Sequence, residues 1–138
     1  VPQSVFIFDE TIKYNITLLD QKEIIDQMLF NKAIQESHLS NFIKEKKNGS
    51  KTKIGGLQMK ISGGERQRIG IARALYRNAE IIIFDEATAS LDKFSEEKIL
   101  SNIYKKAYQN KIIILCTHNK EILKNCSRVI NLNDYSKS

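Results

Sequence analysis

The sequence predicts an α/β fold in which a parallel sheet is combined with helices and with an inserted helical segment. Residues 81–84 (Ile-Ile-Ile-Phe) and 111–116 (Lys-Ile-Ile-Ile-Leu-Cys) are short apolar runs, typical of parallel strands buried on both faces. Residues 62–77 carry apolar side chains at helical spacing, and residues 17–60 contain two shorter helical patterns. The chain has 138 residues, 41% of them hydrophobic, which is enough for one sizeable core.

The N-terminal stretch is mostly apolar, with acidic and polar interruptions. Gln3 comes first, and residues 4–16 follow it. If residues 6–8 (Phe-Ile-Phe) alternate as in a strand, two of the three side chains are buried.

Residues 17–60 predict a helical region. The Asp-Gln-Lys-Glu pattern at 20–23 is a capping box, which predicts the start of a helix. The apolar residues of this helix are Ile24, Ile25, Met28 and Leu29. A second helix is expected from Ser37 to about Lys46, with an Asn-Gly-Ser turn at 48–50 ending it. Its inward side chains are Leu39, Phe42 and Ile43.

The segment from Ser62 to about Arg77 predicts a helix of roughly 24 Å, at about 1.5 Å per residue. Ser62 and Glu65 form a second capping box, in which each side chain bonds the backbone N–H of the other residue. Gly63 and Gly64 add no side chains, so an anion such as phosphate can approach the positive end of the helix dipole. Two apolar stripes follow, Ile69, Ala72 and Tyr76 on one and Ile71, Ala74 and Leu75 on the other. The arginines, Arg66, Arg68, Arg73 and Arg77, fall largely on the remaining surface.

Polar residues follow both predicted strands. Asp85 and Glu86 come after the first strand, and Thr117 and His118 after the second. In open α/β sheets, ligands bind at the carboxyl ends of the strands. Asp85 fits an outer-sphere or water-mediated Mg²⁺ ligand, because Mg²⁺ keeps most of its waters and takes only one or two protein carboxylates. Glu86 fits a group that orients or deprotonates water, and His118 could touch a terminal phosphate.

In their order along the chain these motifs resemble the C-terminal part of the nucleotide-binding domain of an ATP-binding cassette (ABC) transporter. The family's order is glutamine loop, helical subdomain, signature motif, Walker B strand, aspartate loop and histidine switch. The corresponding residues are Gln3, about 17–60, 61–65, 81–86, 89–92 and His118. The resemblance implies a P-loop NTPase-like parallel sheet core, incomplete here, with an inserted α-helical subdomain. Residues 1–138 would then be a partial ATPase domain, in which 61–138 supply the signature helix and the Walker B and histidine-loop part of the core.

The resemblance also implies roles for single residues, with ATP and Mg²⁺ as cofactors. The implied catalytic residues are Glu86, His118 and Gln3, and the implied metal ligands are Asp85 and Gln3. The implied nucleotide-binding residues are Ser62, Gly63, Gly64, Glu65 and Asp92. In the family the signature residues contact the γ-phosphate of ATP held by the opposite subunit, so a second nucleotide-binding domain is an expected partner in a head-to-tail dimer. Ile61 replaces the usual leucine of the signature, and Glu65 the usual glutamine.

The pattern F-x-x-T-I-x-x-N-I, which follows Gln3, resembles the sequence of ABC exporters at this place. Its residues here are Phe8, Thr11, Ile12, Asn15 and Ile16. The segment at 52–58 departs from the exporter pattern, because Gly56 stands for the usual glutamate and Gln58 for the usual last glycine. The family docks its transmembrane domains on the helical subdomain near residues 6–8, so these aromatic residues are either a docking surface or part of the core.

A phosphate loop, G-x-x-x-x-G-K-[ST], is absent from the sequence. The first residue is Val1 and not methionine. We therefore expect the chain to be a fragment of a longer protein that hydrolyses ATP, and to bind or hydrolyse ATP poorly by itself.

The formal net charge of +6 comes from lysines interspersed with acids, which predicts a solvated surface and no nucleic-acid partner. An ABC-type ATPase of DNA repair or chromosome maintenance is the alternative, but those relatives insert long coiled coils between the glutamine and the signature. A non-catalytic cassette subunit is a third possibility, against which the intact Glu86 and His118 argue.

No apolar run reaches the roughly 18 residues of a membrane span, and no signal peptide is visible. Cys116 and Cys126 are expected to be free, partly buried thiols. The family resemblance implies a position at the cytoplasmic face of the cell (inner) membrane.

Overall fold

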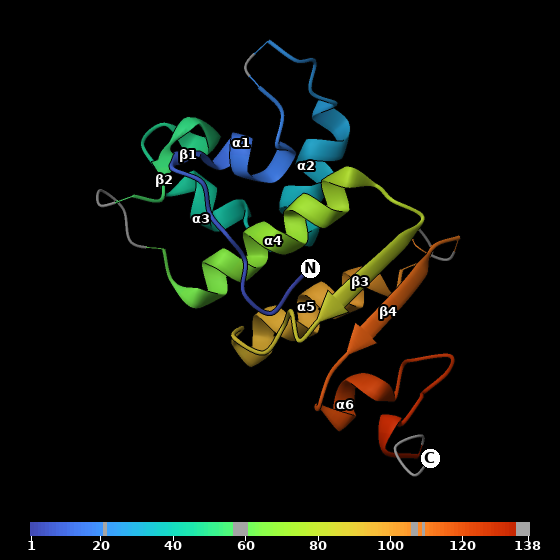
Figure 1. Ribbon diagram of the computed structural model, residues 1–138. Helices are drawn as coiled ribbons and strands as arrows, with labels where there is room; N and C mark the ends of the chain where they lie inside the picture. The colour runs from blue at the N-terminus through green and yellow to red at the C-terminus, as the bar shows by residue number, and fades with distance from the viewer. Residues whose placement is uncertain (21, 57–60, 106–107, 109, 135–138) are drawn as a thin grey trace.

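The computed structural model describes residues 1–20, 22–56, 61–105, 108 and 110–134. One long helix, α4 (Gly63–Arg77), lies between a helical part and a small parallel sheet (Figure 1). Its two apolar stripes contribute to two separate cores. Ile69 and Ala72 pack among the helices of the first half of the chain, whereas Ile71 and Leu75 pack against the sheet. The two stripes predicted from the sequence are confirmed, and α4 is the element that joins the two parts.

The N-terminal stretch forms a short strand and a helix that the sequence analysis does not predict. Strand β1 (Glu10–Thr11) pairs in antiparallel fashion with β2 (Lys53–Ile54), and helix α1 (Ile12–Thr17) follows directly. Thr11 caps α1, because its Oγ1 accepts a hydrogen bond from Tyr14 N at 3.0 Å. The threonine of the exporter-like pattern thus stabilises the start of α1.

The aromatic residues near the N-terminus are less buried than strand alternation predicts. Phe6 is 68% exposed and Phe8 38% exposed, and their rings meet edge to face with centroids 4.9 Å apart. Ile7 is only half-buried. The prediction that two of these three side chains are buried is wrong, because the segment is not a strand and does not alternate between two faces.

The helical region consists of α2 (Gln27–Glu36), α3 (Ser40–Lys44) and a 3-10 turn, η1 (Gly49–Lys51). Helix α2 begins after Asp26, whose Oδ1 accepts a hydrogen bond from Leu29 N at 2.9 Å. The predicted start at Asp20 is therefore wrong. Glu23 does bond the Asp20 N–H, at 2.7 Å, but the Glu23 N–H bonds the Asp20 carbonyl and closes a turn. The second residue of that pattern, Gln21, lies outside the described residues.

The second predicted helix, Ser37 to Lys46, is also longer than the observed one. Ser37 is the C-cap of α2, and His38 has a left-handed backbone with φ of 60°. The chain therefore turns at His38 before α3 begins at Ser40. The inward positions of Leu39 and Phe42 are confirmed, and the partly buried Ile43 packs against the same core.

The loop after β2 contains two glycines with positive φ, Gly55 at 89° and Gly56 at 60°. A Cβ on Gly55 would lie 2.8 Å from the Phe8 carbonyl oxygen, which explains the glycine. A Cβ on Gly56 would lie 3.0 Å from the Asp9 carboxylate. The remaining two residues of the exporter-like segment, Leu57 and Gln58, lie outside the described residues.

The parallel sheet consists of β3 (Ile81–Asp85) and β4 (Ile112–Cys116), with Asp85 opposite Cys116. Helix α5 (Lys93–Ile103) contributes Ile99 and Ile103 to the core on one face of this sheet. The other face carries exposed isoleucines, Ile81, Ile83, Ile112 and Ile114. The prediction of strands buried on both faces is thus wrong for the described structure, because its helices cover one face only.

After β4, the described residues form two short elements, α6 (Lys120–Leu123) and η3 (Leu132–Asp134). Both cysteines are free, as predicted; Cys126 is partly buried, but Cys116 at the end of β4 is exposed. In the part of the chain that the structure describes, no helix is long and apolar enough to cross a membrane.

Candidate functional site

Three of the predicted site residues meet at the carboxyl ends of the two parallel strands. Gln3 Nε2 donates a hydrogen bond to Glu86 Oε2 at 2.9 Å. On the other carboxylate oxygen, His118 Nε2 lies 3.0 Å from Glu86 Oε1. Glu86 is therefore held between an amide from the N-terminal segment and an imidazole that follows β4.

The parallel register explains why these residues meet. Because Asp85 is opposite Cys116, the residues that follow the two strands leave the sheet at the same edge. Val1 runs beside β3, since the Asp85 N–H donates to the Val1 carbonyl at 2.9 Å. This contact brings Gln3, two residues later, to the same edge.

The backbone of Glu86 is held in an unusual conformation. Its φ is 46°, in the left-handed region that non-glycine residues seldom adopt. Its N–H donates to the Cys116 carbonyl at 3.0 Å, and its carbonyl accepts from the Ala89 N–H at 3.1 Å. Such a conformation costs on the order of 1–3 kcal/mol and is retained only where surrounding contacts impose it. Here it turns the Glu86 carboxylate toward Gln3 and His118.

The oxygen atoms at this edge suit Mg²⁺. Asp85 is exposed at the end of β3, and the hydrogen bond to Glu86 uses the amide nitrogen of Gln3, not its oxygen. Among the described residues no group of three or more His, Cys, Asp or Glu side chains could hold a metal ion. A Mg²⁺ ion at this edge would be held by the Asp85 carboxylate and the Gln3 amide oxygen, since Mg²⁺ needs only one or two protein side chains.

The predicted capping box at the start of α4 is present in full. Ser62 Oγ accepts from Glu65 N at 3.2 Å, and Glu65 Oε2 accepts from Ser62 N at 2.8 Å. The Glu65 carboxylate therefore stabilises the helix start of its own chain. Gly63 is exposed and Gly64 half-buried, so backbone at the helix start faces solvent.

The aspartate loop packs against this helix start. Ser90 Oγ donates to the Gly63 carbonyl at 3.5 Å, and a Cβ on Gly64 would lie 3.4 Å from the Ser90 carbonyl oxygen. Asp92 caps α5, because its Oδ1 accepts from Ser95 N at 2.9 Å. The Ser95 hydroxyl, then the Ser95 amide, are the main groups that lower the pKa of the exposed Asp92 carboxyl. In the described chain Asp92 is thus a helix cap.

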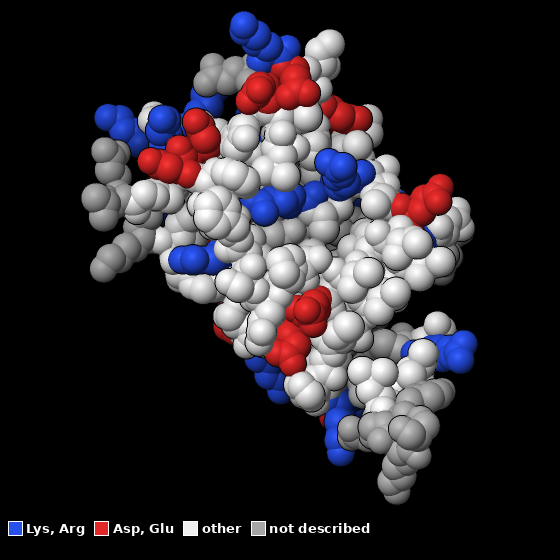
Figure 2. Space-filling model, in the orientation of Figure 1, with Lys and Arg blue, Asp and Glu red and all other residues white. Residues whose placement is uncertain are grey.

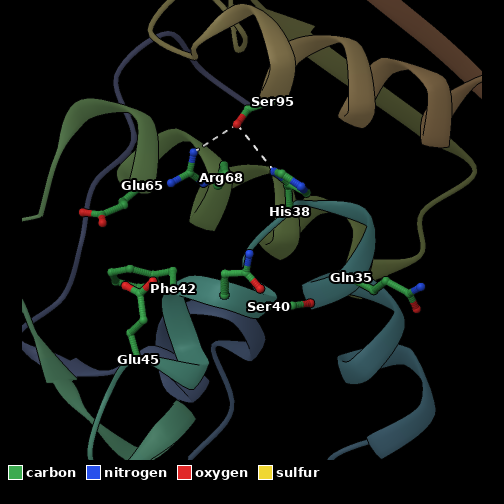
Figure 3. Close-up of a pocket in the computed structure, with 9 residues that line it drawn as sticks. Gln35, His38, Ser40, Phe42, Glu45, Glu65, Arg68 and Ser95 are labelled. Carbon is green, nitrogen blue, oxygen red and sulfur yellow. Dashed lines mark hydrogen bonds between the residues drawn. The ribbon is translucent and has the colours of Figure 1, made fainter.

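Three residues that connect α4 and α5 with the turn before α3 were not predicted from the sequence as site residues. Arg68, Ser95 and His38 line an open pocket of about 400 Å³ between α3, α4 and α5 (Figure 3). Arg68 Nη1 donates to Ser95 Oγ at 3.5 Å and lies 3.9 Å from Asp92 Oδ2, and His38 Nδ1 is 3.5 Å from the same Ser95 oxygen. The local sequence gives no signal for these contacts, because Ser95 lies 27 residues from Arg68 and 57 from His38.

The surface position predicted for the arginines of α4 is therefore wrong for two of them. Arg68 is half-buried in the pocket described above. Arg73 donates from Nε to the Asn15 carbonyl at 2.9 Å and from Nη2 to the Phe6 carbonyl at 3.1 Å. Both arginines bond groups distant in sequence, which helical periodicity alone cannot reveal.

The predicted site residues form two groups in the described chain. Gln3, Glu86 and His118 meet at the strand ends, whereas Ser62 and Glu65 lie at the start of α4. Within the described residues no hydrogen bond joins one group to the other.

Comparisons with known proteins show the family to which the chain belongs. A family model described as ABC transporter matches residues 1–89. The chain is 34% identical over 133 residues to an ATP-dependent lipid A-core flippase of Cupriavidus pinatubonensis, which covers 96% of the chain and 22% of the flippase. It is 38% identical over 130 residues to the toxin RTX-III translocation ATP-binding protein of Actinobacillus pleuropneumoniae, which covers 94% of the chain and 18% of that protein.

A solved structure of an ABC exporter is also similar to the chain. A bacterial Atm1-family ABC exporter with ATP bound matches with a TM-score of 0.77 and 33% sequence identity, over 88% of this chain and 21% of the exporter chain. The chain therefore spans about a fifth of the length of the relatives it matches. The family model, which covers more than half of the 138 residues, agrees with the relatives and the solved structure, and the chain belongs to the ABC transporter family.

Proposed function

We propose that this chain is part of the ATP-binding and ATP-hydrolysing domain of an ABC transporter and helps to drive a substrate across a membrane. The observation that carries the proposal is the placement of Gln3 and His118 on the two oxygens of Glu86, at the carboxyl ends of parallel strands. That edge is the ligand-binding edge of open α/β sheets. The printed names of the relatives, a flippase and a translocation ATP-binding protein, support the coupling to transport.

Each residue of this group then has a role in hydrolysis. Each oxygen of Glu86 keeps a second lone pair, so the carboxylate can accept a proton from an attacking water while Gln3 and His118 hold it in place. Asp85 and the Gln3 amide oxygen would hold Mg²⁺, which neutralises phosphate charge when it is bound. Because the His118 side chain is exposed, a terminal phosphate bound at this edge could reach the imidazole while it contacts Glu86.

The start of α4 would serve the nucleotide of a second copy of the domain. Ser62 and Gly63 offer exposed backbone at a positive helix end, and among the described residues neither they nor Gly64 form a hydrogen bond with Glu86 or His118. A head-to-tail dimer would place this helix start, with Glu65 and Asp92 beside it, over the partner's strand ends. In this arrangement the start of α4 from one copy and the strand-end residues of the other copy would contact the same ATP molecule.

The transmembrane domains are the second expected partner. The relative from Haemophilus influenzae, 36% identical over 132 residues, is named a probable ABC transporter ATP-binding/permease protein, and the chain covers 23% of it. The exposed Phe6 and Phe8 form an edge-to-face pair that would suit a docking surface for such domains. The domain would then lie at the cytoplasmic face of the membrane.

The alternative functions have less support. In the view of Figure 2, lysine and arginine side chains are separated by acidic and uncharged residues and do not form one basic stripe of the kind that binds DNA. A non-catalytic subunit would not need Glu86 in contact with both Gln3 and His118. Because the phosphate loop is absent from residues 1–138, we propose that hydrolysis requires the complete protein.

Glu86→Gln in the full-length protein tests the proposed function. Glutamine keeps the size and one acceptor oxygen but cannot act as a base, so ATP turnover should fall by about 10²–10⁴-fold. ATP binding, measured by equilibrium titration with Mg-ATP, should be retained. The matched control is Glu97→Gln, a change at an exposed position of α5. Unchanged turnover in Glu86→Gln, or loss of ATP binding together with turnover, would contradict the proposed role.

A further inference from the structure

We propose that Glu96 and Asn119 form a positioning pair that fixes the loop carrying His118 to the first turn of α5, and so holds the imidazole at Glu86. The inference deepens the proposed function and rests on it. It adds two residues that act through His118 and do not touch the reacting atoms.

His118 needs such support because little else holds its side chain. The side chain is 96% exposed, and its described contact is with Glu86 Oε1, at 3.0 Å. Strand β4 ends at Cys116 and α6 begins at Lys120, so three residues connect the two elements. The position of the imidazole therefore depends on what fixes the backbone of these three residues.

Asn119 fixes that backbone through three hydrogen bonds. Its N–H donates to Thr117 Oγ1 at 3.0 Å, which closes a tight turn around His118. Its Oδ1 accepts from Glu121 N at 3.0 Å and caps α6. With the amide oxygen directed at α6, the amide nitrogen donates to Glu96 Oε2 at 3.3 Å. The residue beside His118 is thus tied to two different helices.

Glu96 provides a firm attachment point, because the first turn of α5 is well held. Asp92 caps this turn, and the neighbouring Ser95 is buried and contacts Arg68 and His38 through its hydroxyl (Figure 3). A side chain on a helix turn fixed by several contacts positions its partner better than a side chain on a loop.

The pair therefore connects the aspartate loop to the histidine loop. Asp92 and Glu96 lie one turn apart on α5, with Asp92 at the proposed dimer interface and Glu96 on the side that reaches Asn119. A shift of this turn when a second copy binds would move the attachment of the His118 loop. The contact between His118 and Glu86, which is present in the single chain, would therefore respond to the binding of a second copy at Asp92.

An exchange of donor and acceptor tests the pair in the full-length transporter. Asn119→Asp keeps a good helix cap for α6 but sets a carboxylate against the Glu96 carboxylate, which separates the two side chains. Turnover per site, kcat, should fall about tenfold, the effect expected from losing one hydrogen bond to a charged group. KM for ATP and the thermal unfolding temperature should remain close to those of the wild type.

The double variant Asn119→Asp with Glu96→Gln restores the bond in the opposite sense, because the glutamine amide donates to the new carboxylate. It should recover most of the lost kcat. Asn119→Asp with Glu97→Gln, which changes the next residue along the same helix, should not. Glu96→Ala removes the bond from the α5 side and leaves the loop sequence intact, so it should lower kcat by a similar factor even if the Asn119 variants fold poorly.

The variant His118→Ala distinguishes a failure of the positioning pair from a failure of the proposed function. If His118→Ala lowers kcat but Asn119→Asp and Glu96→Ala do not, the positioning pair is overturned and the proposed function stands. Equal kcat in Asn119→Asp and in its double variant with Glu96→Gln would also overturn the pair. Normal turnover in both His118→Ala and Glu86→Gln would overturn the proposed function itself.

Discussion

Asn15 is fully buried although its side chain is an amide, and both ends of that amide bond the loop around it. Its Nδ2 donates to the Phe8 carbonyl at 3.0 Å, to the Thr11 carbonyl at 3.1 Å and to the Glu10 carbonyl at 3.4 Å. Its Oδ1 accepts from Phe8 N at 2.9 Å. The asparagine of the exporter-like pattern therefore shapes the segment that carries the exposed aromatic residues.

Asn15→Ala should destabilise the protein by about 2–4 kcal/mol, because several buried backbone groups would lose their partners at once. The free energy of unfolding, measured by urea denaturation, gives the comparison with the wild type. Asn41→Ala, at an exposed position of α3, is the matched control and should change the free energy by less than about 0.5 kcal/mol. A small effect for both variants would mean that water replaces the Asn15 amide.

Residues that are distant in sequence decide the arrangement at Glu86. Gln3 and Glu86 are 83 residues apart in sequence, and the positive φ of Glu86 depends on a bond to the Cys116 carbonyl. Local sequence favours neither feature, because a glutamate has no preference for a left-handed backbone. The residue types at this site could be predicted, but their contact could not.

Among the elements, α4 was predicted most accurately. Its start at Ser62 and its end at Arg77 follow from a capping box and from periodicity, which involve residues three or four positions apart. The start of α2 was predicted wrongly, because Asp20 and Asp26 both resemble helix caps and only one begins a helix. After Asp20 the chain instead makes a turn, closed by the bond from the Glu23 N–H to the Asp20 carbonyl, and Ile24 is 96% exposed.

The start of α4 has two functions that can be separated by substitution. Ser62→Ala removes the cap and should lower the free energy of unfolding by about 1 kcal/mol. Ser62→Asp keeps a good cap and should leave that free energy nearly unchanged, while its charge repels phosphate at the helix start. We therefore expect Ser62→Asp to lower ATP turnover of the full-length protein more than Ser62→Ala does. The opposite order would indicate that Ser62 acts only as a helix cap.

At the scale of the whole molecule, one face of the sheet is covered and the other is not. The register pairs Ile83 with Ile114 and Ile81 with Ile112, and these four side chains are between 44% and 60% exposed. An apolar group of this kind on a sheet surface favours association with another surface. For residues 1–138 in isolation, the available surface is a second copy of the same chain.

Ile83→Thr together with Ile114→Thr should weaken self-association of the isolated chain by about tenfold, because less apolar area is buried on contact. Threonine keeps the β-branched shape that strands favour, so the sheet should persist. Sedimentation velocity over a range of concentrations measures the effect. Ile24→Thr is the control, since Ile24 is 96% exposed but lies in a loop away from the sheet. Equal weakening by the control would place the association surface elsewhere.

The sequence by itself determined the two parallel strands, helix α4, the order of the motifs and the candidate site residues. Capping, helical periodicity and short apolar runs act over a few neighbouring residues, so they can be recognised without a fold. The tertiary structure decided which face of each strand is buried, where α2 starts, and that Arg68 and Arg73 bond other elements. It also brought Gln3 and His118 to Glu86, and Asn119 to Glu96. These contacts join residues far apart in the chain, and their geometry depends on how the sheet and helices pack.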